Sequence, residues 1–170
     1  MLSRLRPWGP HSALALGLLL MALATDQGSK LYLMRVVRIG EIAPIQLGPW
    51  FEIVMAWNPG ISYGLFAQGS MTGQYVLGTL MLSAAAGLWF WAARAANRLV
   101  AMSVALIAGG AIGNAIDRFA YGAVADFFHF FIESAGFHWY IFNIADVWIV
   151  AGVVGLLYDS FVGGHDDAAK

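Results

Sequence analysis

The sequence contains no cysteine and few charged residues. The absence of cysteine excludes disulfides, thiolate metal sites and thiol nucleophiles. Lysine, arginine, aspartate and glutamate together make up 11% of the chain, against about 25% in an ordinary soluble domain. The formal net charge of −1 provides no basic surface for a nucleic acid. These figures exclude a nucleic-acid binder and almost any soluble domain of this length.

The sequence also lacks the histidine pairs and motifs of common metal sites and hydrolase active sites. The four histidines are scattered and no two are spaced i, i+4, so no metal site is predicted. The sequence has neither the G-x-S-x-G motif of serine hydrolases nor the H-E-x-x-H motif of zinc peptidases. We therefore expect no metal and no cofactor.

Apolar residues are in excess, at 60% hydrophobic and 14% aromatic. A helix needs about 20 mostly apolar residues to cross a membrane. Four runs qualify, at about 12–33, 72–93, 99–118 and 141–160. The fold class predicted is an all-α membrane protein in which residues 1–170 form one domain with four transmembrane helices.

The segments between the spans have a different composition. Residues 36–66 combine β-prone runs with glycine and proline, which predicts a small extramembrane sheet, or β-cradle. Its aromatic residues suit the headgroup layer of a membrane. Residues 119–140 are expected to form a second extramembrane element, an amphipathic helix or a half-buried loop.

The first span also has features of a secretory signal peptide. Arg4 and Arg6 form a basic start, and the residues up to Ala24 form an apolar stretch with a cleavage-like end. However, cleavage there would remove most of the helix that places Asp26 and Lys30 on one face. We therefore predict that the first span is retained in the mature protein.

The basic residues predict the orientation of the spans. Arg4, Arg6, Arg94 and Arg98 all flank span ends on the side of the two termini. Because basic residues in short loops favour the cytoplasm, both termini are predicted to be cytoplasmic. Most acidic residues then lie at the outer face of the membrane.

Polar residues occur near the span ends in five short blocks. A carboxylate at membrane depth costs at least about 2.5–3.5 kcal/mol, and such residues are therefore rare and usually functional. The blocks are Asp26-Gln-Gly-Ser-Lys30, Asn58-Pro-Gly60-Ile-Ser-Tyr63-Gly64, Gly113-Asn114-Ala-Ile-Asp117-Arg118, Val124-Ala-Asp126-Phe and Phe142-Asn143-Ile-Ala145-Asp146. We expect the functional site to be built from these blocks.

The first two blocks are open to structural and functional interpretations. Asp26 and Lys30 are spaced i, i+4, so they can neutralise each other as an ion pair. They also suit contact with a lipid headgroup or a substrate. Asn58 and Gly60 fit a turn into the next helix as well as a binding site.

The third block places Asn114, Asp117 and Arg118 on one helix face. Arg118 stays protonated and needs a carboxylate, and Asp117 is the nearest candidate. For Asp117 we favour a polar clamp between helices over a direct role in chemistry.

Asp126 and Asp146 have no basic partner nearby in the sequence. Unpaired carboxylates at one depth are either protonated or face each other, although Asp126 also fits a loop that caps the last span. Facing carboxylates share one proton, which provides a general base and a general acid for splitting an amide with water. Asp117 is a second candidate to oppose Asp146. A different class of function, a small proton-coupled carrier with the aspartates as a relay, is the alternative.

Together the blocks resemble those of the bacterial lipoprotein signal peptidases (signal peptidase II). Asp-x-x-Ser-Lys, Asn-x-Gly-x-Ser-aromatic-Gly, Gly-Asn-x-x-Asp-Arg, Val-x-Asp-Phe and Phe-Asn-x-Ala-Asp occur in this order from Asp26 to Asp146. Tyr63 stands where the family often has Phe or Trp. The resemblance implies an aspartyl endopeptidase of the bacterial inner membrane, with four transmembrane helices, a periplasmic β-cradle and a periplasmic helix. The sequence itself gives no oligomeric state, and we expect a monomer by default.

The resemblance also implies a substrate and a set of site residues. Such enzymes cut the signal peptide from prolipoproteins just before a diacylglyceryl-modified cysteine, and the lipopeptide globomycin inhibits them at the catalytic pair. Asp126 and Asp146 match the catalytic pair. Residues predicted to line or support the site are Asp26, Lys30, Asn58, Gly60, Asn114, Asp117, Arg118, Asn143 and Ala145.

Overall fold

The computed structural model describes residues 7–60 and 69–167, with side chains as far as residue 162. Its long helices are α1 (Ser12–Leu31), α2 (Met71–Ala92), α3 (Arg98–Tyr121) and α4 (Ile144–Asp167), and α1 continues into a π-helix, Tyr32–Val37. Four segments are long and apolar enough to cross a membrane: Ser12–Val37, Met71–Ala92, Arg98–Tyr121 and Ile144–Val162. The four predicted spans are confirmed, and the first extends further than residue 33.

Capping residues explain where α2 and α3 begin and where α3 ends. Asn97 is the N-cap of α3, and its side chain accepts a hydrogen bond of 2.9 Å from the backbone N–H of Val100. Ser70 is the N-cap of α2, and its side chain accepts from the backbone N–H of Gly73 at 3.1 Å. Such side-chain acceptors satisfy N–H groups that have no partner within the helix. α3 ends at Gly122, whose φ of 73° is in the left-handed region that glycine adopts freely.

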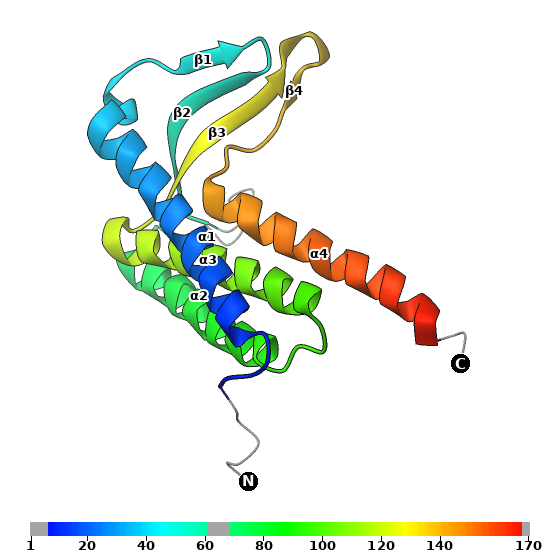
Figure 1. Cartoon of the computed structure of the whole chain (residues 1–170). Helices are drawn as coiled ribbons and strands as arrows, with labels where there is room; N and C mark the ends of the chain where they lie inside the picture. The colour runs from blue at the N-terminus through cyan, green and yellow to red at the C-terminus, as the bar shows by residue number, and fades with distance from the viewer. Residues whose placement is uncertain (1–6, 61–68, 168–170) are drawn as a thin grey trace.

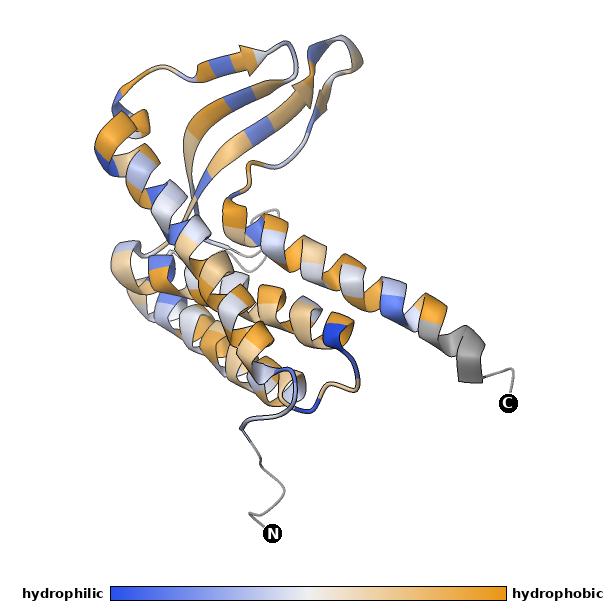
Figure 2. Ribbon diagram, viewed as in Figure 1, coloured by the Kyte–Doolittle hydropathy of each residue, from blue (hydrophilic) through white to orange (hydrophobic). Residues whose placement is uncertain are grey.

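Helix α3 is central and packs against the other three long helices (Figure 1). A Cβ atom at Gly109 would lie 2.8 Å from the carbonyl oxygen of Leu19 on α1. One at Gly110 would lie 2.5 Å from the carbonyl oxygen of Ala145 on α4. Glycine at these positions therefore allows the close approach of the three helices. The remaining helix surfaces carry many exposed apolar side chains, as a lipid-facing surface requires (Figure 2).

A four-stranded antiparallel sheet lies at one end of the helices, away from the start of α1 (Figure 1). Its strands are β1 (Ile45–Gly48), β2 (Phe51–Asn58), β3 (Val124–Ile132) and β4 (Phe137–His138), in the order β1-β2-β3-β4. The strands β1 and β2 confirm the cradle predicted within residues 36–66. Residues 61–66 of that range, including Tyr63, lie outside the described residues.

The prediction of an amphipathic helix within residues 119–140 was wrong. Apart from the end of α3 at Tyr121, that segment contains strands β3 and β4 and only one three-residue 3-10 helix, Glu133–Ala135. Its run of phenylalanines, valine and isoleucine favours a strand. The decisive partner is β2, which lies about 70 residues earlier in the chain and pairs with β3 over most of its length. A local sequence pattern does not report such a distant pairing.

The two faces of this sheet have different environments. On one face, Leu33 and Ile39 form an apolar cluster with Ala125 and Phe127 of β3. Because successive residues of a strand point to opposite faces, Asp126 points to the other face of the sheet. The sheet thus presents Asp126 on the side that faces α4.

Candidate active site

The five polar blocks meet where α1, α3 and α4 join the sheet. The site takes Asp26 and Lys30 from α1, Asn58 and Gly60 from the end of β2, Asn114, Asp117 and Arg118 from α3, Asp126 from β3, and Asn143, Ala145 and Asp146 from the start of α4. Every predicted site residue is therefore brought to this one junction.

A cavity of about 180 Å³ lies at the junction. Asp126 and Asp146 both line it, together with Asn58, Gly60, Met81, Asn114, Arg118, Val124, Tyr140 and Ile149. The two carboxylates come from different elements, β3 and α4. Both interact electrostatically with Arg118 of α3. Asp117 is not among the lining residues. The structure thus groups Asp146 with Asp126 rather than with Asp117.

The carboxylate of Asp126 is 3% exposed and is held by two asparagines. Asn143 donates to Oδ1 at 2.6 Å and Asn58 donates to Oδ2 at 3.2 Å. Burial, and to a smaller extent the charge of Asp146, together raise the pKa of Asp126 from 3.8 to about 7, against the lowering effect of the two hydrogen bonds. A buried carboxylate close to a second one is therefore poised to exchange a proton near neutral pH.

Asp146 and Asn143 hold each other at the first turn of α4. The Asp146 carboxylate accepts from the Asn143 backbone N–H at 3.1 Å, and the Asn143 side chain accepts from the Asp146 backbone N–H at 3.1 Å. This reciprocal arrangement is a capping box, and it explains why the two residues are three positions apart. Asn114 donates to the other Asp146 oxygen at 3.1 Å. Asn143 therefore contacts both carboxylates that line the cavity.

Lys30 lies behind the cavity and joins two further carboxylates. Its Nζ is 2.9 Å from Asp26 and 2.8 Å from Asp117, and it donates to Asn114 at 3.1 Å. All three charged side chains are at most 1% exposed. The predicted Asp26–Lys30 pair is confirmed, and it is part of a buried triad.

The two carboxylates of this triad also bind backbone N–H groups. Asp26 accepts from the N–H of Ala145 at 3.0 Å, and Asp117 accepts from the N–H of Ala125 at 3.1 Å. Ala145 and Ala125 immediately precede Asp146 and Asp126. The triad therefore positions the backbone next to both carboxylates of the cavity.

The predicted pairing of Asp117 with Arg118 was wrong. Arg118 donates instead to the Gln74 side chain at 2.7 Å and to the carbonyl oxygen of Gly60. Neighbouring positions of a helix point about 100° apart, so Asp117 faces Lys30 while Arg118 faces α2 and the turn after β2. That turn is held by Asn58, which accepts from the N–H of Gly60 at 3.0 Å.

The comparison with known proteins identifies the family. Residues 18–162 match the family model described as signal peptidase (SPase) II. The chain belongs to the signal peptidase II family. It is therefore a peptidase, and its four spans make it a multi-pass membrane protein. The alternative of a proton-coupled carrier is not supported by this match.

Similar proteins agree with this family along most of the chain. A lipoprotein signal peptidase of Nitrobacter hamburgensis is 52% identical over 143 residues, which cover 83% of this chain and 87% of that protein. One of Rhodopseudomonas palustris strain TIE-1 is 49% identical, over 84% of this chain and 88% of that one. A solved structure of a bacterial membrane enzyme, at 2.3 Å resolution, aligns with a TM-score of 0.71 and 27% identity, over 87% of this chain and 90% of its own.

Some residues of this signal peptidase II site were missed from the sequence. Gln74 is buried on α2, where it accepts from Arg118 and donates to the carbonyl oxygen of Pro59 at 2.6 Å. Gln27 donates to Asp26 and Asp117 at 3.1 Å each. Gln74 is a polar side chain within an apolar span, which is a signal for an interhelical contact, and Gln27 lies inside the first polar block.

Within the described residues, the carboxylates of the peptidase site are not grouped as metal ligands. Within residues 7–60 and 69–162, no three His, Asp or Glu side chains are grouped to hold a metal ion. Among the described residues, the polar groups of the site are carboxylates, amides, one lysine, one arginine and the phenol of Tyr140.

Proposed function

We propose that this peptidase removes the signal peptide from diacylglyceryl-modified prolipoproteins by cutting just before the lipidated cysteine. Membership in the signal peptidase II family, and similarity to lipoprotein signal peptidases of other bacteria, support this substrate. The position of the cavity also supports it. The cavity lies at the end of the spans, where a membrane-embedded signal helix ends and water is available.

The proposed catalytic groups are Asp126 and Asp146. The observation that carries this assignment is that both line one cavity while Asn143 contacts each of them. The pKa of Asp126 near 7 allows the pair to hold one proton at neutral pH, and this proton belongs to the pair rather than to either residue.

The pair has the groups for hydrolysis without a covalent intermediate. The ionised carboxylate takes a proton from water as the water oxygen bonds to the scissile carbonyl carbon. The protonated carboxyl donates its proton to the carbonyl oxygen, which gives a gem-diol. The C–N bond then breaks as the first carboxyl protonates the amine nitrogen. A hydroxyl proton of the gem-diol returns to the second carboxylate, which restores the starting pair.

The other polar residues position this pair. Asn143, Asn114 and Asn58 donate to the two carboxylates and orient them. Arg118 holds the turn at Gly60, which lines the same cavity. The buried Lys30 triad fixes the backbone beside both aspartates.

We place the enzyme in the bacterial inner membrane as a monomer, with both termini in the cytoplasm and the site at the periplasmic face. The basic residues that flank the spans support this orientation. Globomycin is expected to bind the same cavity, since it would compete for the two carboxylates.

The test is cleavage of a diacylglyceryl-modified prolipoprotein by the purified protein, followed by gel shift. The native chain is expected to cleave it and globomycin to block cleavage. Asp126→Asn and Asp146→Asn should each lower the rate by about 10²–10⁴-fold. Asp159→Asn is a matched control, because Asp159 lies on α4 and contacts Asn97 rather than the cavity.

Two results would contradict the proposal. Failure of the folded native chain to cleave would remove the substrate assignment. Cleavage that survives Asp126→Asn but is lost in Asp117→Asn, with both variants folded, would move the catalytic pair to Asp117 and Asp146.

A further inference from the structure

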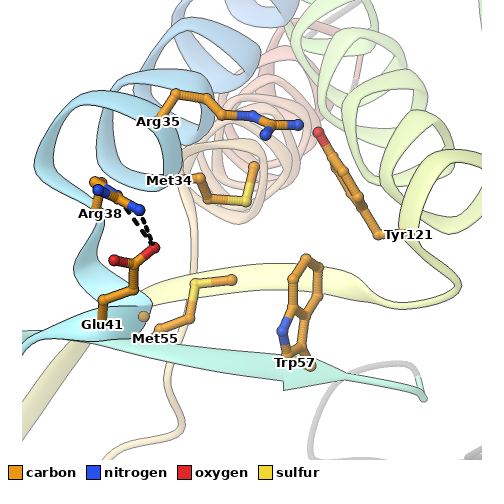
Figure 3. Close-up of a pocket in the computed structure, with 8 residues that line it drawn as sticks. Met34, Arg35, Arg38, Glu41, Met55, Trp57 and Tyr121 are labelled. Carbon is orange, nitrogen blue, oxygen red and sulfur yellow. Dashed lines mark hydrogen bonds and ion pairs between the residues drawn. The ribbon is translucent and has the colours of Figure 1, made fainter.

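A second cavity, of about 340 Å³, lies on the other side of the sheet from Asp126. The π-helix after α1, strand β2 and the last residue of α3 enclose it (Figure 3). Met55 and Trp57 line this cavity and lie on the opposite face of β2 from Asn58, which lines the first cavity. The two cavities are therefore separate sites.

One cation in this second cavity is free to bind a ligand. Arg38 is paired with Glu41, with 2.9 Å between Nη2 and Oε1. Arg35, by contrast, makes no hydrogen bond or ion pair within the part of the chain that the structure describes. Its guanidinium points into the cavity, toward the hydroxyl of Tyr121 (Figure 3). That hydroxyl also has no hydrogen-bond partner among the described residues.

The two free donors define the charge and shape of the ligand. A guanidinium offers up to five N–H donors in a planar fork, and a phenol offers one more. This combination suits a group with several oxygen acceptors and a negative charge, and arginine binds phosphate with particular preference. The Arg38–Glu41 pair adds no net charge, so the cavity has a net charge of about +1 and matches a single phosphodiester.

The backbone around the cavity is unusual in two ways. Arg35 lies within the π-helix Tyr32–Val37, a conformation that is rare and often found at functional sites. Arg38 has a φ of 57° and is the one non-glycine residue with positive φ among the described residues. Such strained conformations are retained where they have a use. Both features lie on the segment that closes the cavity.

The surroundings indicate that the phosphate belongs to a lipid. Tyr32 and Val36, on the same helix end as Arg35, are 57% and 68% exposed. Trp57 and Tyr121 lie with ring centroids 5.5 Å apart at the rim. Exposed apolar side chains beside such aromatics, at the end of a span, are typical of the membrane–water interface. A lipid headgroup here can place its acyl chains along the exposed surface of α1.

We infer that this cavity binds the phosphodiester headgroup of an anionic membrane phospholipid, with Arg35 and Tyr121 as its donors. The bound lipid joins the end of the first span to strand β2 and holds the sheet against the membrane. This site does not depend on the catalytic assignment, because its lining residues are distinct from those of the first cavity.

The test is native mass spectrometry of the full chain released from micelles that contain equal amounts of phosphatidylglycerol and phosphatidylcholine. The native protein is expected to retain one phosphatidylglycerol preferentially. Arg35→Gln should lower this retention about fivefold, as one basic residue near a lipid surface contributes. Tyr121→Phe should lower it by a smaller factor. Arg98→Gln removes the same charge at the other end of the bundle and should leave retention unchanged.

Three results would overturn the inference. Equal retention by the native chain and Arg35→Gln would show that the cavity holds no lipid phosphate. An equal loss in Arg98→Gln would show a general effect of charge. Displacement of the lipid by millimolar inorganic phosphate would show a site for the free anion. Unfolding midpoints of the variants, measured in the same detergent, check that each remains folded.

Discussion

The Nζ of Lys30 lies 2.8 Å from the Oδ2 of Asp117, and both side chains are buried. This contact supports the proposal that Asp126, rather than Asp117, takes part in chemistry with Asp146. Asp117 shares Lys30 with Asp26 and accepts from the N–H of Ala125, so its carboxylate is held by structural contacts. Among the described residues, Asp126 accepts hydrogen bonds only from neutral donors, which fits the proton exchange proposed for it.

Replacing Lys30 should strongly destabilise the protein. Lys30→Met leaves Asp26 and Asp117 buried without a cation, and breaking a buried ion pair in this way costs about 3–5 kcal/mol. Thermal unfolding in detergent measures the change. Arg38→Met is the comparison, because the Arg38–Glu41 pair is 64% and 61% exposed and such pairs contribute less than about 1 kcal/mol. Equal losses in the two variants would show that the triad is not a buried electrostatic centre.

The activity should fall as the pH rises through about 7. The pKa of Asp126 is raised from 3.8 to about 7, chiefly by burial, and above this pH the proposed catalytic pair loses its last proton. The rate should then decrease up to about tenfold per pH unit. A profile of kcat/KM between pH 5.5 and pH 9 measures this. A rate that keeps increasing up to pH 9 would exclude a shared proton.

The same shift predicts how stability depends on pH. A carboxyl whose folded pKa is raised favours folding in its protonated form, so its favourable effect is complete below pH 3.8 and is lost as the pH rises to about 7. Asp126→Asn removes this titration. The stability of Asp126→Asn relative to the native chain should therefore increase between about pH 4 and pH 7 and stay constant above it. Denaturant unfolding at a series of pH values tests this, and a flat difference would contradict it.

Two substitutions of Asn143 should separate its structural and positioning roles. Asn143→Ala removes the cap of α4, at about 1 kcal/mol, and also removes the donor to Asp126. Asn143→Ser keeps a side-chain acceptor for the Asp146 N–H but lacks the amide donor. We expect Asn143→Ser to unfold near the native midpoint yet to lose peptidase activity as fully as Asn143→Ala. If Asn143→Ser has both the stability and the activity of the native protein, the Asn143 amide has no role beyond capping α4.

The contact between α3 and α4 should not tolerate a methyl group. Gly110→Ala places a Cβ atom 2.5 Å from the carbonyl oxygen of Ala145, next to Asp146, and overpacking of this kind costs about 1–3 kcal/mol. Gly87→Ala on α2 is the matched control, because no atom lies within 4 Å of its Cβ position. It should be neutral or stabilising by up to about 1 kcal/mol. Thermal unfolding compares the two, and equal effects would contradict the close packing.

Local sequence determined the spans and one contact of the site. The four transmembrane helices follow from apolar runs of sufficient length, because a helix satisfies its own backbone hydrogen bonds in the membrane. The Asp26–Lys30 pair also follows from spacing alone, since the two residues lie about one turn apart on a helix. Such a contact depends on few residues and on geometry that is nearly invariant.

Only the tertiary structure decided which polar groups meet across the chain. Strand β3 forms because β2 offers it an edge, although the two are separated by the whole of α2 and α3. The same pairing turns Asp126 toward α4 and away from the apolar cluster around Ile39. Asp117 binds Lys30 rather than its neighbour Arg118, because helix packing sets which side chain faces which partner. These outcomes depend on contacts between distant segments, for which spacing along the chain carries no information.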